Sequence, residues 1–235
     1  MIASKDFGNN HSSVEVMNGA QLASIGWVQE REDINRVQRA LEWCFALIVL
    51  VVSAPLIAVL AILIKLDSPG PVFFRHKRLG RGAKPFDFIK LRTFYADARQ
   101  RWPELYAYQY TAEDLDKLFF KTPEDPRITR LGRWLRRSTF DELPNFWHVL
   151  TGDMNVIGPR PEIPEMLPYY SASERRKFSV KPGISGMAQV SGRGKLNFRD
   201  TVRLDIEYVD NKSMKLDFIL FVKTTLSVLR LDGAF

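Results

Sequence analysis

The stretch WCFALIVLVVSAPLIAVLAILI, residues 43–64, has 22 consecutive positions without a charged side chain. As a straight helix at ~1.5 Å per residue it would be ~33 Å long, enough to cross a ~30 Å hydrocarbon core. A core helix of a soluble protein is rarely this long without a charge. A secretory signal peptide fits less well, because the run begins late and no convincing cleavage site follows it. The stretch therefore predicts insertion into a membrane.

Pro55, near the middle of this run, leaves two modes of insertion open. Proline removes a backbone donor and clashes with the preceding turn, so a kink is expected there. The hydroxyl of Ser53 can bond a carbonyl that the kink frees. Each arm would then be ~11 residues and ~16 Å long, about half a membrane. The helix could therefore span the bilayer or enter and leave by the same face, and residue physics alone does not choose between these arrangements.

Both flanks of the run are basic. The charges are Arg31, Arg36 and Arg39 before it, and Lys65, Arg75, Lys77, Arg78, Arg81 and Lys84 after it. Because positive charge marks the cytoplasmic side of a membrane, the bulk of the chain is predicted to face the cytosol in either arrangement. We divide the chain into a polar N-terminal segment (1–28), a membrane-associated helix (29–65) and a cytoplasmic domain (66–235).

The composition restricts the partners without naming one. A chain of 235 residues suggests one domain with appendages, and 46% apolar residues exclude wholesale disorder. The net charge of +7 favours anionic partners: nucleic acid, acidic headgroups or phosphorylated small molecules. The single cysteine, Cys44, excludes an internal disulfide, and the three histidines show no zinc-ligand spacing.

The cytoplasmic part reads as an α+β fold, mostly helical, with short strands. We expect strands within 66–74 and at 84–94, the latter as a second strand or as the hairpin partner of the first. Helices are expected at 96–109 (interrupted by Pro103), 130–138 and 216–231. The helix at 130–138 is basic and amphipathic, which suits a headgroup surface as well as a solvated domain face. The helix at 216–231 is apolar but broken by Lys223, so it is expected to pack on the domain or lie in the membrane interface.

The stretch STFDELPN, residues 138–145, places Asp141 and Glu142 side by side. It directly follows an arginine cluster of five residues in eleven positions: Arg127, Arg130, Arg133, Arg136 and Arg137. One explanation is structural, since Thr139 with Glu142 three residues later forms the pattern of a capping box. Another is chemical, because adjacent carboxylates could share a divalent ion while Asp141 attacks phosphorus. Arginines would hold the aspartate ionised and bind the anion.

Other cations could also contact phosphates. Arg160 lies between two prolines in VIGPRPEIP (156–164), where a rigid loop suits bidentate phosphate contact or is simply a turn. Arg193 lies in the glycine-rich KPGISGMAQVSGRGK (181–195), whose amides could approach a phosphate, although turns explain it equally well. Lys90 and Arg92 follow the apolar run on an expected strand, where they could meet a lipid-borne phosphate.

Taken together, these segments resemble one known family. The stretches are DSPGPVFFRHKRLGRGAKPFDFIKLRTF (67–94), DPRITRLGRWLRRSTFDELPNFWHVLTGDMNVIGPRPE (125–162) and VKPGISGMAQVSGRG (180–194). With the apolar run and the C-terminal helix, they closely resemble the bacterial sugar transferase family: monotopic phosphoglycosyl transferases acting on polyprenyl phosphate. The resemblance covers residues from about 40 to 232, and DELPN through GPRP is its most specific part.

The resemblance implies a reaction for the domain at 66–235. A UDP-sugar gives its sugar phosphate to undecaprenyl phosphate, with release of UMP. Asp141 is implied as the nucleophile that forms a covalent phosphosugar intermediate, and Glu142 as its dyad partner. Both carboxylates are implied as ligands of Mg²⁺, with Mn²⁺ as an alternative ion. The resemblance implies Arg160 as a nucleotide-side arginine and Lys90 as a phosphate-contacting lysine. We add Arg92, Arg127 and Arg193 as further candidate phosphate or nucleotide contacts, from their charge and position alone.

The resemblance also implies a re-entrant membrane helix that breaks near Ser53 and Pro55. It places the protein on an anionic bilayer at the cytoplasmic face of a bacterial inner membrane. The step would be the first membrane step of a polysaccharide or glycoconjugate pathway, such as exopolysaccharide biosynthesis. A homo-oligomer is compatible with the resemblance, and nucleic acid is not an expected partner. Only about 40 residues precede the core, which suggests a short form or an isolated core.

The sequence departs from the family pattern at a few positions. We would expect Met in place of Phe94, Asn in place of His148 and Trp in place of Met187, and Ala54 separates Ser53 from Pro55. One alternative function remains: a non-catalytic, membrane-anchored protein that binds a polyanion or acidic lipid. Such a protein would need the charge and the apolar helices, but neither the acidic pair nor GPRP.

Overall fold

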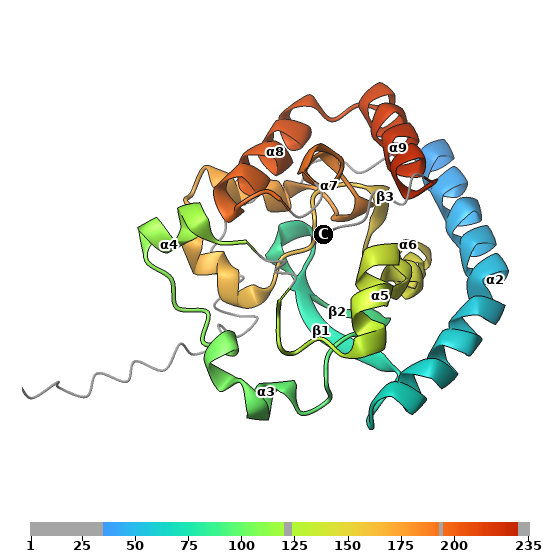
Figure 1. The fold of residues 1–235 in the computed structure, drawn as a ribbon. Coiled ribbons are helices and arrows are strands. Elements are labelled where there is room, and N and C mark those ends of the chain that lie inside the picture. The colour runs from blue at the N-terminus through green and yellow to red at the C-terminus, as the bar shows by residue number, and fades with distance from the viewer. Residues whose placement is uncertain (1–34, 120–123, 193–194, 230–235) are drawn as a thin grey trace, which may run out of the picture.

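The computed structural model of the chain describes residues 35–119, 124–192 and 195–229. The predictions for residues 1–28 and for Arg193 lie outside the described residues. Helices and strands carry the labels of Figure 1, which begin at α2.

The apolar run lies within one long helix, α2 (Arg36–Asp67), along one side of the molecule (Figure 1). The Asn35 side chain accepts the backbone N–H of Gln38 at 2.8 Å and so caps the start of the helix. The helix stops at Ser68, whose extended backbone is the conformation that the following Pro69 favours. It is long and apolar enough to cross a membrane, and its apolar side chains are largely exposed. This is compatible with membrane association.

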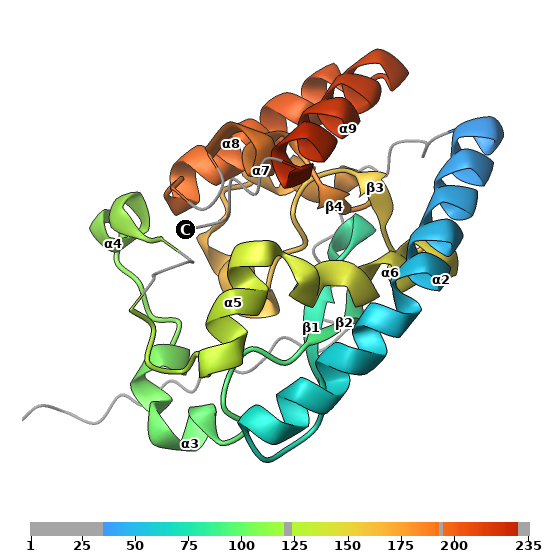
Figure 2. The same cartoon turned by 45° about the vertical axis from the view of Figure 1, so that its right-hand side comes forward.

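The helix α2 is continuous through Pro55. The Ser53 hydroxyl donates to the Leu50 carbonyl at 3.4 Å, within the turn that precedes the proline. The predicted break near Ser53 and Pro55 is therefore not an interruption of the helix. Figures 1 and 2 show α2 following a curved path beside the domain. Re-entry into the bilayer stays a prediction.

The first two strands confirm the predicted hairpin. β1 (Phe73–Leu79) pairs antiparallel with β2 (Pro85–Leu91), and the turn between them contains η1 (Arg81–Ala83). β1 runs further than its apolar start suggested, through RHKRL. Alternate residues of β1 are less exposed than their neighbours, so one face of the strand looks inward although it carries polar side chains.

The remaining elements are mostly helical, as predicted. After the hairpin come α3 (Ala98–Arg101), η2 (Pro103–Tyr106), α4 (Ala112–Lys117), α5 (Arg130–Ser138), η3 (Phe140–Asn145) and α6 (Phe146–Thr151). Then come β3 (Asn155–Ile157), η4 (Pro164–Tyr169), η5 (Glu174–Ser179), β4 (Gly183–Ser185), α7 (Met187–Gly192), α8 (Phe198–Asn211) and α9 (Met214–Leu229). β3 and β4 pair in parallel. The described residues thus form an α+β fold with two small sheets and one long apolar helix.

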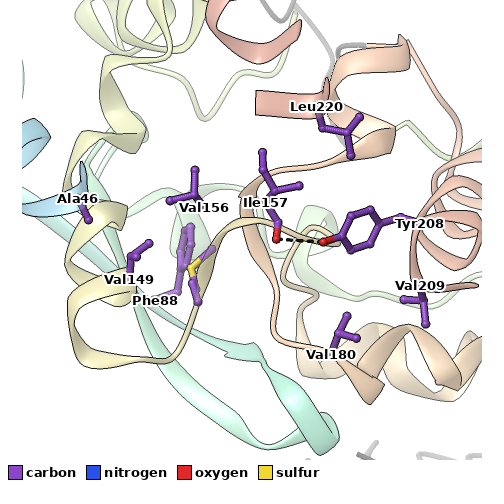
Figure 3. Close-up of a cluster of buried hydrophobic side chains, with 10 residues drawn as sticks. Ala46, Phe88, Val149, Val156, Ile157, Val180, Tyr208, Val209 and Leu220 are labelled. Atoms are coloured by element: carbon purple, nitrogen blue, oxygen red, sulfur yellow. Dashed lines mark hydrogen bonds between the residues drawn. The ribbon is translucent and has the colours of Figure 1, made fainter. Parts of the chain in front are cut away.

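The main hydrophobic core lies around β3 (Figure 3). It contains side chains of β3 itself and of α2, β2, α6, α8 and α9. Tyr208 donates to the Ile157 carbonyl at 3.3 Å and to the Asp217 carboxylate at 2.7 Å. Ala46 of α2 lies fully buried in the same cluster. The strand that leads into GPRP is therefore anchored to the long helix on one side and to α8 and α9 on the other.

The C-terminal helix α9 packs on the domain, which was one of the two arrangements predicted for it, and a place in the membrane interface stays a prediction. Leu220 and Asp217 are buried against the domain, and Gln38 of α2 donates to Asp217 at 2.9 Å. The opposite face exposes large apolar side chains, among them Phe218 and Val222. α9 therefore packs on the domain and also leaves an apolar face beside the N-terminal end of α2 (Figure 1).

Candidate active site

The acidic pair lies on η3, directly after a sharp turn at Thr139. This residue has a left-handed backbone (φ 61°), which is uncommon for a β-branched residue and is found where the surroundings enforce it. The predicted capping box at Thr139 is wrong: its side chain caps nothing, and its carbonyl instead accepts the Glu142 N–H at 3.1 Å. A side-chain N-cap needs an extended backbone, which Thr139 lacks. The acidic pair does begin a helical segment, as expected.

Asp141 is 5% exposed and faces two cations. Strand β2 packs on η3 and places the Lys90 ammonium 3.5 Å from the Asp141 carboxylate. Burial lowers the pKa of Lys90, and Asp141 opposes that effect. Burial also lowers the pKa of Arg136 on α5, and here too Asp141 is the main opposing charge. Two cations beside one buried carboxylate favour its ionised form, as a nucleophile requires.

Glu142 faces a second pair of cations. The Arg160 guanidinium lies 3.6 Å from the Glu142 carboxylate, and both side chains are partly exposed. Burial lowers the pKa of Arg78 on β1 to about 10, with Arg160 adding to the effect and Glu142 among the acids opposing it. Arg78 therefore stays charged at neutral pH. The four cations outnumber the two carboxylates of the pair, so the site suits a ligand with more than one negative charge.

The comparison with family models assigns the chain to a family. The model of the bacterial sugar transferase family matches residues 34–231. The chain belongs to the bacterial sugar transferase family. Every site residue described above lies inside the matched range.

Curated relatives of the chain carry names that agree with the family. The chain is 37% identical to galactosyl transferase CpsE of Streptococcus agalactiae, over 70% of this chain and 36% of the relative. It is 34% identical to undecaprenyl-phosphate galactose phosphotransferase of Salmonella typhimurium, over 85% of this chain and 42% of the relative. It is 35% identical to UDP-glucose:undecaprenyl-phosphate glucose-1-phosphate transferase of Caulobacter vibrioides, over 94% of this chain and 81% of the relative. The chain thus spans less than half of the first two relatives and most of the third.

Two of the predicted phosphate contacts have other partners in the structure. Arg92 is buried and donates to the carbonyls of Ser68 and Pro69 at 2.7 Å each, just beyond the end of α2. Arg127 forms a bidentate pair with Asp125, with distances of 2.9 and 2.8 Å, and stacks on Phe94. These contacts give both arginines structural roles, and the geometry does not support a phosphate contact by Arg92.

Sequence reasoning missed Arg78 and Arg136 as site residues. Arg136 was read only as one member of the arginine cluster. Arg78 belongs to the inward face of β1. Its cross-strand partner is Phe86, four pairs along the ladder from the pair of Phe74 with Lys90. Alternation along β1 was the signal that could have placed Arg78 on the face of Lys90.

The described glycines of the stretch 181–195 serve packing. A side chain at Gly183 or Gly186 would collide with the backbone of Gly158, which begins GPRP. Glycine here allows β4 to approach the GPRP segment closely. The glycine-rich stretch therefore supports the segment that carries Arg160, and its predicted use as a phosphate cradle has no support among the described residues.

The donor set of the acidic pair fits one kind of metal site. Among the described residues, no group of three or more His, Cys, Asp or Glu side chains could hold a metal ion. Mg²⁺ does not need such a cage, because it commonly binds one or two carboxylates and completes its shell with water and substrate phosphates. Asp141 and Glu142 fit a site of this kind.

Proposed function

We propose that the chain transfers a sugar phosphate from a UDP-sugar to undecaprenyl phosphate, yielding undecaprenyl-diphosphate-sugar and UMP. The observation that carries this proposal is the acidic pair on η3 surrounded by Lys90, Arg78, Arg136 and Arg160. The names of two relatives support the proposal, because they describe transfer of galactose phosphate or glucose 1-phosphate to undecaprenyl phosphate. The transfer would be the first membrane step of polysaccharide synthesis.

The reaction proceeds by two displacements at one phosphorus atom. A carboxylate oxygen of Asp141 attacks the β-phosphorus, the bridging P–O bond breaks, and UMP leaves with the electron pair. The product is an acyl phosphate that joins Asp141 to the sugar phosphate. An oxygen of the lipid phosphate then attacks the same phosphorus and displaces the Asp141 carboxylate. Covalent catalysis of this kind lets one small site use two phosphate substrates in turn.

The charged side chains have distinct roles in these steps. Lys90 and Arg136 keep Asp141 ionised and hold the phosphate that it attacks. Arg160 and Arg78 lie on the Glu142 side, where they bind the diphosphate and stabilise the charge that develops on UMP. Mg²⁺ held by Asp141 and Glu142 would neutralise charge on the diphosphate when bound. Burial of Asp141 keeps water away from the acyl phosphate.

The position of α2 supports access of a lipid phosphate to the site. α2 packs on α5, η3 and α6, the three consecutive elements that contain and flank the acidic pair (Figure 2). Trp134 on α5 and Trp147 on α6 are both about half exposed, and tryptophan is enriched at membrane interfaces. We propose that α2 enters and leaves the bilayer by its cytoplasmic face and that the site lies at headgroup depth. Basic residues on both flanks of the apolar run support this arrangement, because they favour placing both ends of the run at the cytoplasmic face.

The direct test is UMP release by the purified protein with undecaprenyl phosphate, Mg²⁺ and a panel of UDP-sugars. At least one UDP-sugar should release UMP, chelation should stop the release, and Asp141→Asn should abolish it. If no UDP-sugar yields UMP and Asp141→Asn changes nothing, the alternative of a non-catalytic binder of acidic lipid is favoured, since it needs the charge but not the acidic pair.

A further inference from the structure

The GPRPE segment, residues 158–162, is held by backbone hydrogen bonds along its length. The Gly158 N–H donates to the Ser185 carbonyl, and the Pro159 carbonyl accepts from Gly183, both at 2.9 Å. The Glu162 carbonyl accepts the N–H of Leu79 at 2.7 Å. Arg160 lies between these anchors, and its guanidinium reaches Glu142. The backbone of the segment therefore fixes where that guanidinium can lie.

A buried charge cluster, made of Lys177, Glu162, Asp205 and Tyr170, lies beside this segment. The Lys177 ammonium is 3.0 Å from the Asp205 carboxylate and 3.4 Å from that of Glu162. It also donates to the Tyr170 hydroxyl at 3.0 Å, and this hydroxyl donates to Glu162 at 2.7 Å. Lys177 is 2% exposed and Asp205 is 0% exposed. None of the four side chains takes part in the chemistry proposed above.

Stability alone does not explain such a cluster. Removing charges from water carries a large cost, and apolar replacements of whole buried ion clusters are often neutral or stabilising. Burial would raise the pKa of Glu162, but Lys177 and Arg78 outweigh it and hold that pKa below its ordinary value. Burial would lower the pKa of Lys177, but Asp205 and Glu162 outweigh it and raise that pKa. The Lys177–Glu162 pair is therefore ionised at neutral pH, and its presence in the interior requires an explanation other than stability.

The contacts of the cluster supply that reason. The backbone N–H of Arg160 lies near the buried Asp205 carboxylate and lowers the pKa of that carboxyl, although burial raises this pKa overall. The second oxygen of Glu162 accepts the N–H of Ile163 at 3.0 Å. Through these two carboxylates Lys177 acts on the peptide groups at both ends of the Arg160–Pro161–Glu162 turn. Without the ammonium, two buried carboxylates would face each other, and the segment that carries Arg160 would have to move.

We propose that Lys177 is a positioning residue, which acts through Asp205 and Glu162 to hold the Arg160 guanidinium beside Glu142. This inference rests on the proposed function for its activity measurements, but its structural part does not depend on that function.

The experiment compares Lys177→Met with Lys177→Arg, each alone and combined with Arg160→Ala. Displacement of a positioned group by about 1 Å can cost roughly 100-fold, so Lys177→Met should lower kcat/KM for the UDP-sugar by roughly 10- to 100-fold. Lys177→Arg keeps the charge and should recover much of the activity. In the Arg160→Ala background Lys177→Met should cause little further loss, because the group that it positions is gone. The proposal would be overturned if the loss of kcat/KM in the double variant equalled the product of the losses in Lys177→Met and Arg160→Ala.

The matched control is Arg176→Met. Arg176 precedes Lys177 on the same η5 helix, but its ion pair with Asp210, at 3.0 Å, is exposed. Exposed pairs contribute little, so this variant should keep wild-type kcat and KM. If Arg176→Met lowered kcat/KM as much as Lys177→Met, any substitution in η5 would impair the protein. That result would contradict a specific role of Lys177.

A second measurement is independent of activity and of the survival of Lys177→Met. Tyr170→Phe removes only the hydroxyl that bridges Lys177 and Glu162. Amide hydrogen exchange should become faster in a peptide covering 158–163 and stay unchanged in α9. Unchanged exchange at 158–163 would overturn the proposal. If the wild type releases no UMP but Tyr170→Phe speeds this exchange, the proposed function fails while the positioning role stands.

Discussion

The Lys90 ammonium on β2 lies 3.5 Å from the Asp141 carboxylate on η3, so the hairpin and the acidic pair contribute to the same site. The hairpin supplies Lys90 and Arg78, α5 supplies Arg136, and the GPRP segment supplies Arg160. Each element brings a cation to the acidic pair from a different direction. The fold therefore surrounds two carboxylates with positive charge, which is the arrangement that successive phosphate substrates require.

Loss of the Lys90 ammonium should impair catalysis specifically. Lys90→Met is expected to lower kcat by roughly 100- to 1000-fold, because it removes a preorganised charge at the phosphorus that is attacked. It should also shift the acid limb of the pH–rate profile upward, since Asp141 loses a cation that favours its ionised form.

The control for this variant is Lys77→Met. Lys77 belongs to the same hairpin but forms an exposed pair with Asp87 at 2.9 Å. This variant should keep its activity and change stability by less than about 0.5 kcal/mol. Equal losses in both variants would argue against a role of Lys90 in the chemistry.

Arg160→Lys should raise KM for the UDP-sugar by roughly tenfold or more, with a smaller change in kcat. Lysine keeps the charge but loses the planar fork that binds phosphate oxygens bidentately. Steady-state kinetics of UMP release, with each substrate varied in turn, measures the effect. An unchanged KM for the UDP-sugar, with KM for undecaprenyl phosphate raised instead, would place Arg160 on the lipid side of the site.

Arg92→Ala should destabilise the protein by about 2–4 kcal/mol, because it opens a cavity and leaves one buried and one partly buried carbonyl without this donor. The carbonyls concerned belong to Ser68 and Pro69. Protein that remains folded should keep the wild-type KM for the UDP-sugar. Thermal unfolding and kinetics on the same sample test both expectations. Unchanged stability with a raised KM would restore the phosphate role that the sequence suggested for Arg92.

His148 should make stability fall at acidic pH. Its Nε2 accepts the Ile89 N–H at 3.0 Å, and its ring packs on Phe86 and Phe88. Burial lowers the pKa of His148, although Asp153 opposes the shift. As the pH falls below about 6.5, the unfolded chain takes up a proton that the folded state resists, so stability is lost between that pH and the lowered pKa.

The variant for this prediction is His148→Asn, whose amide oxygen can accept the same N–H without titrating. Unfolding measured from pH 7.5 to pH 5.5 should show a weaker pH dependence in the variant than in the wild type. His76, whose pKa burial also lowers, is present in both proteins and does not affect the comparison. Identical pH dependence would show that the His148 imidazole does not resist protonation.

Local signals predicted much of the fold. The helix expected at 130–138 has the bounds of α5, because Thr129 caps it through the Gly132 N–H at 2.9 Å and the apolar spacing is helical. The hairpin was also predicted, but its first strand was drawn too short. Residues of β1 such as His76 and Arg78 are polar and yet face inward, and apolar content does not reveal such a face.

The site was predicted less completely than the fold. Asp141, Lys90 and Arg160 come together as the resemblance implied. The roles of the remaining arginines depend on which partner the fold brings to each one, and sequence spacing does not show this. Arg92 meets the carbonyls after α2, and Arg127 meets Asp125. The capping box failed for a related reason, since Thr139 has a left-handed backbone between α5 and η3, which sequence spacing does not show.

The central claim is that Asp141 forms a covalent bond to the sugar phosphate. Intact-protein mass spectrometry after incubation with Mg²⁺ and a reactive UDP-sugar, without undecaprenyl phosphate, tests it most directly. The account predicts release of UMP and a mass increase equal to one sugar phosphate, which maps to Asp141, disappears on addition of undecaprenyl phosphate and is absent in Asp141→Asn. UMP release that requires the lipid acceptor and leaves the protein mass unchanged would contradict the account.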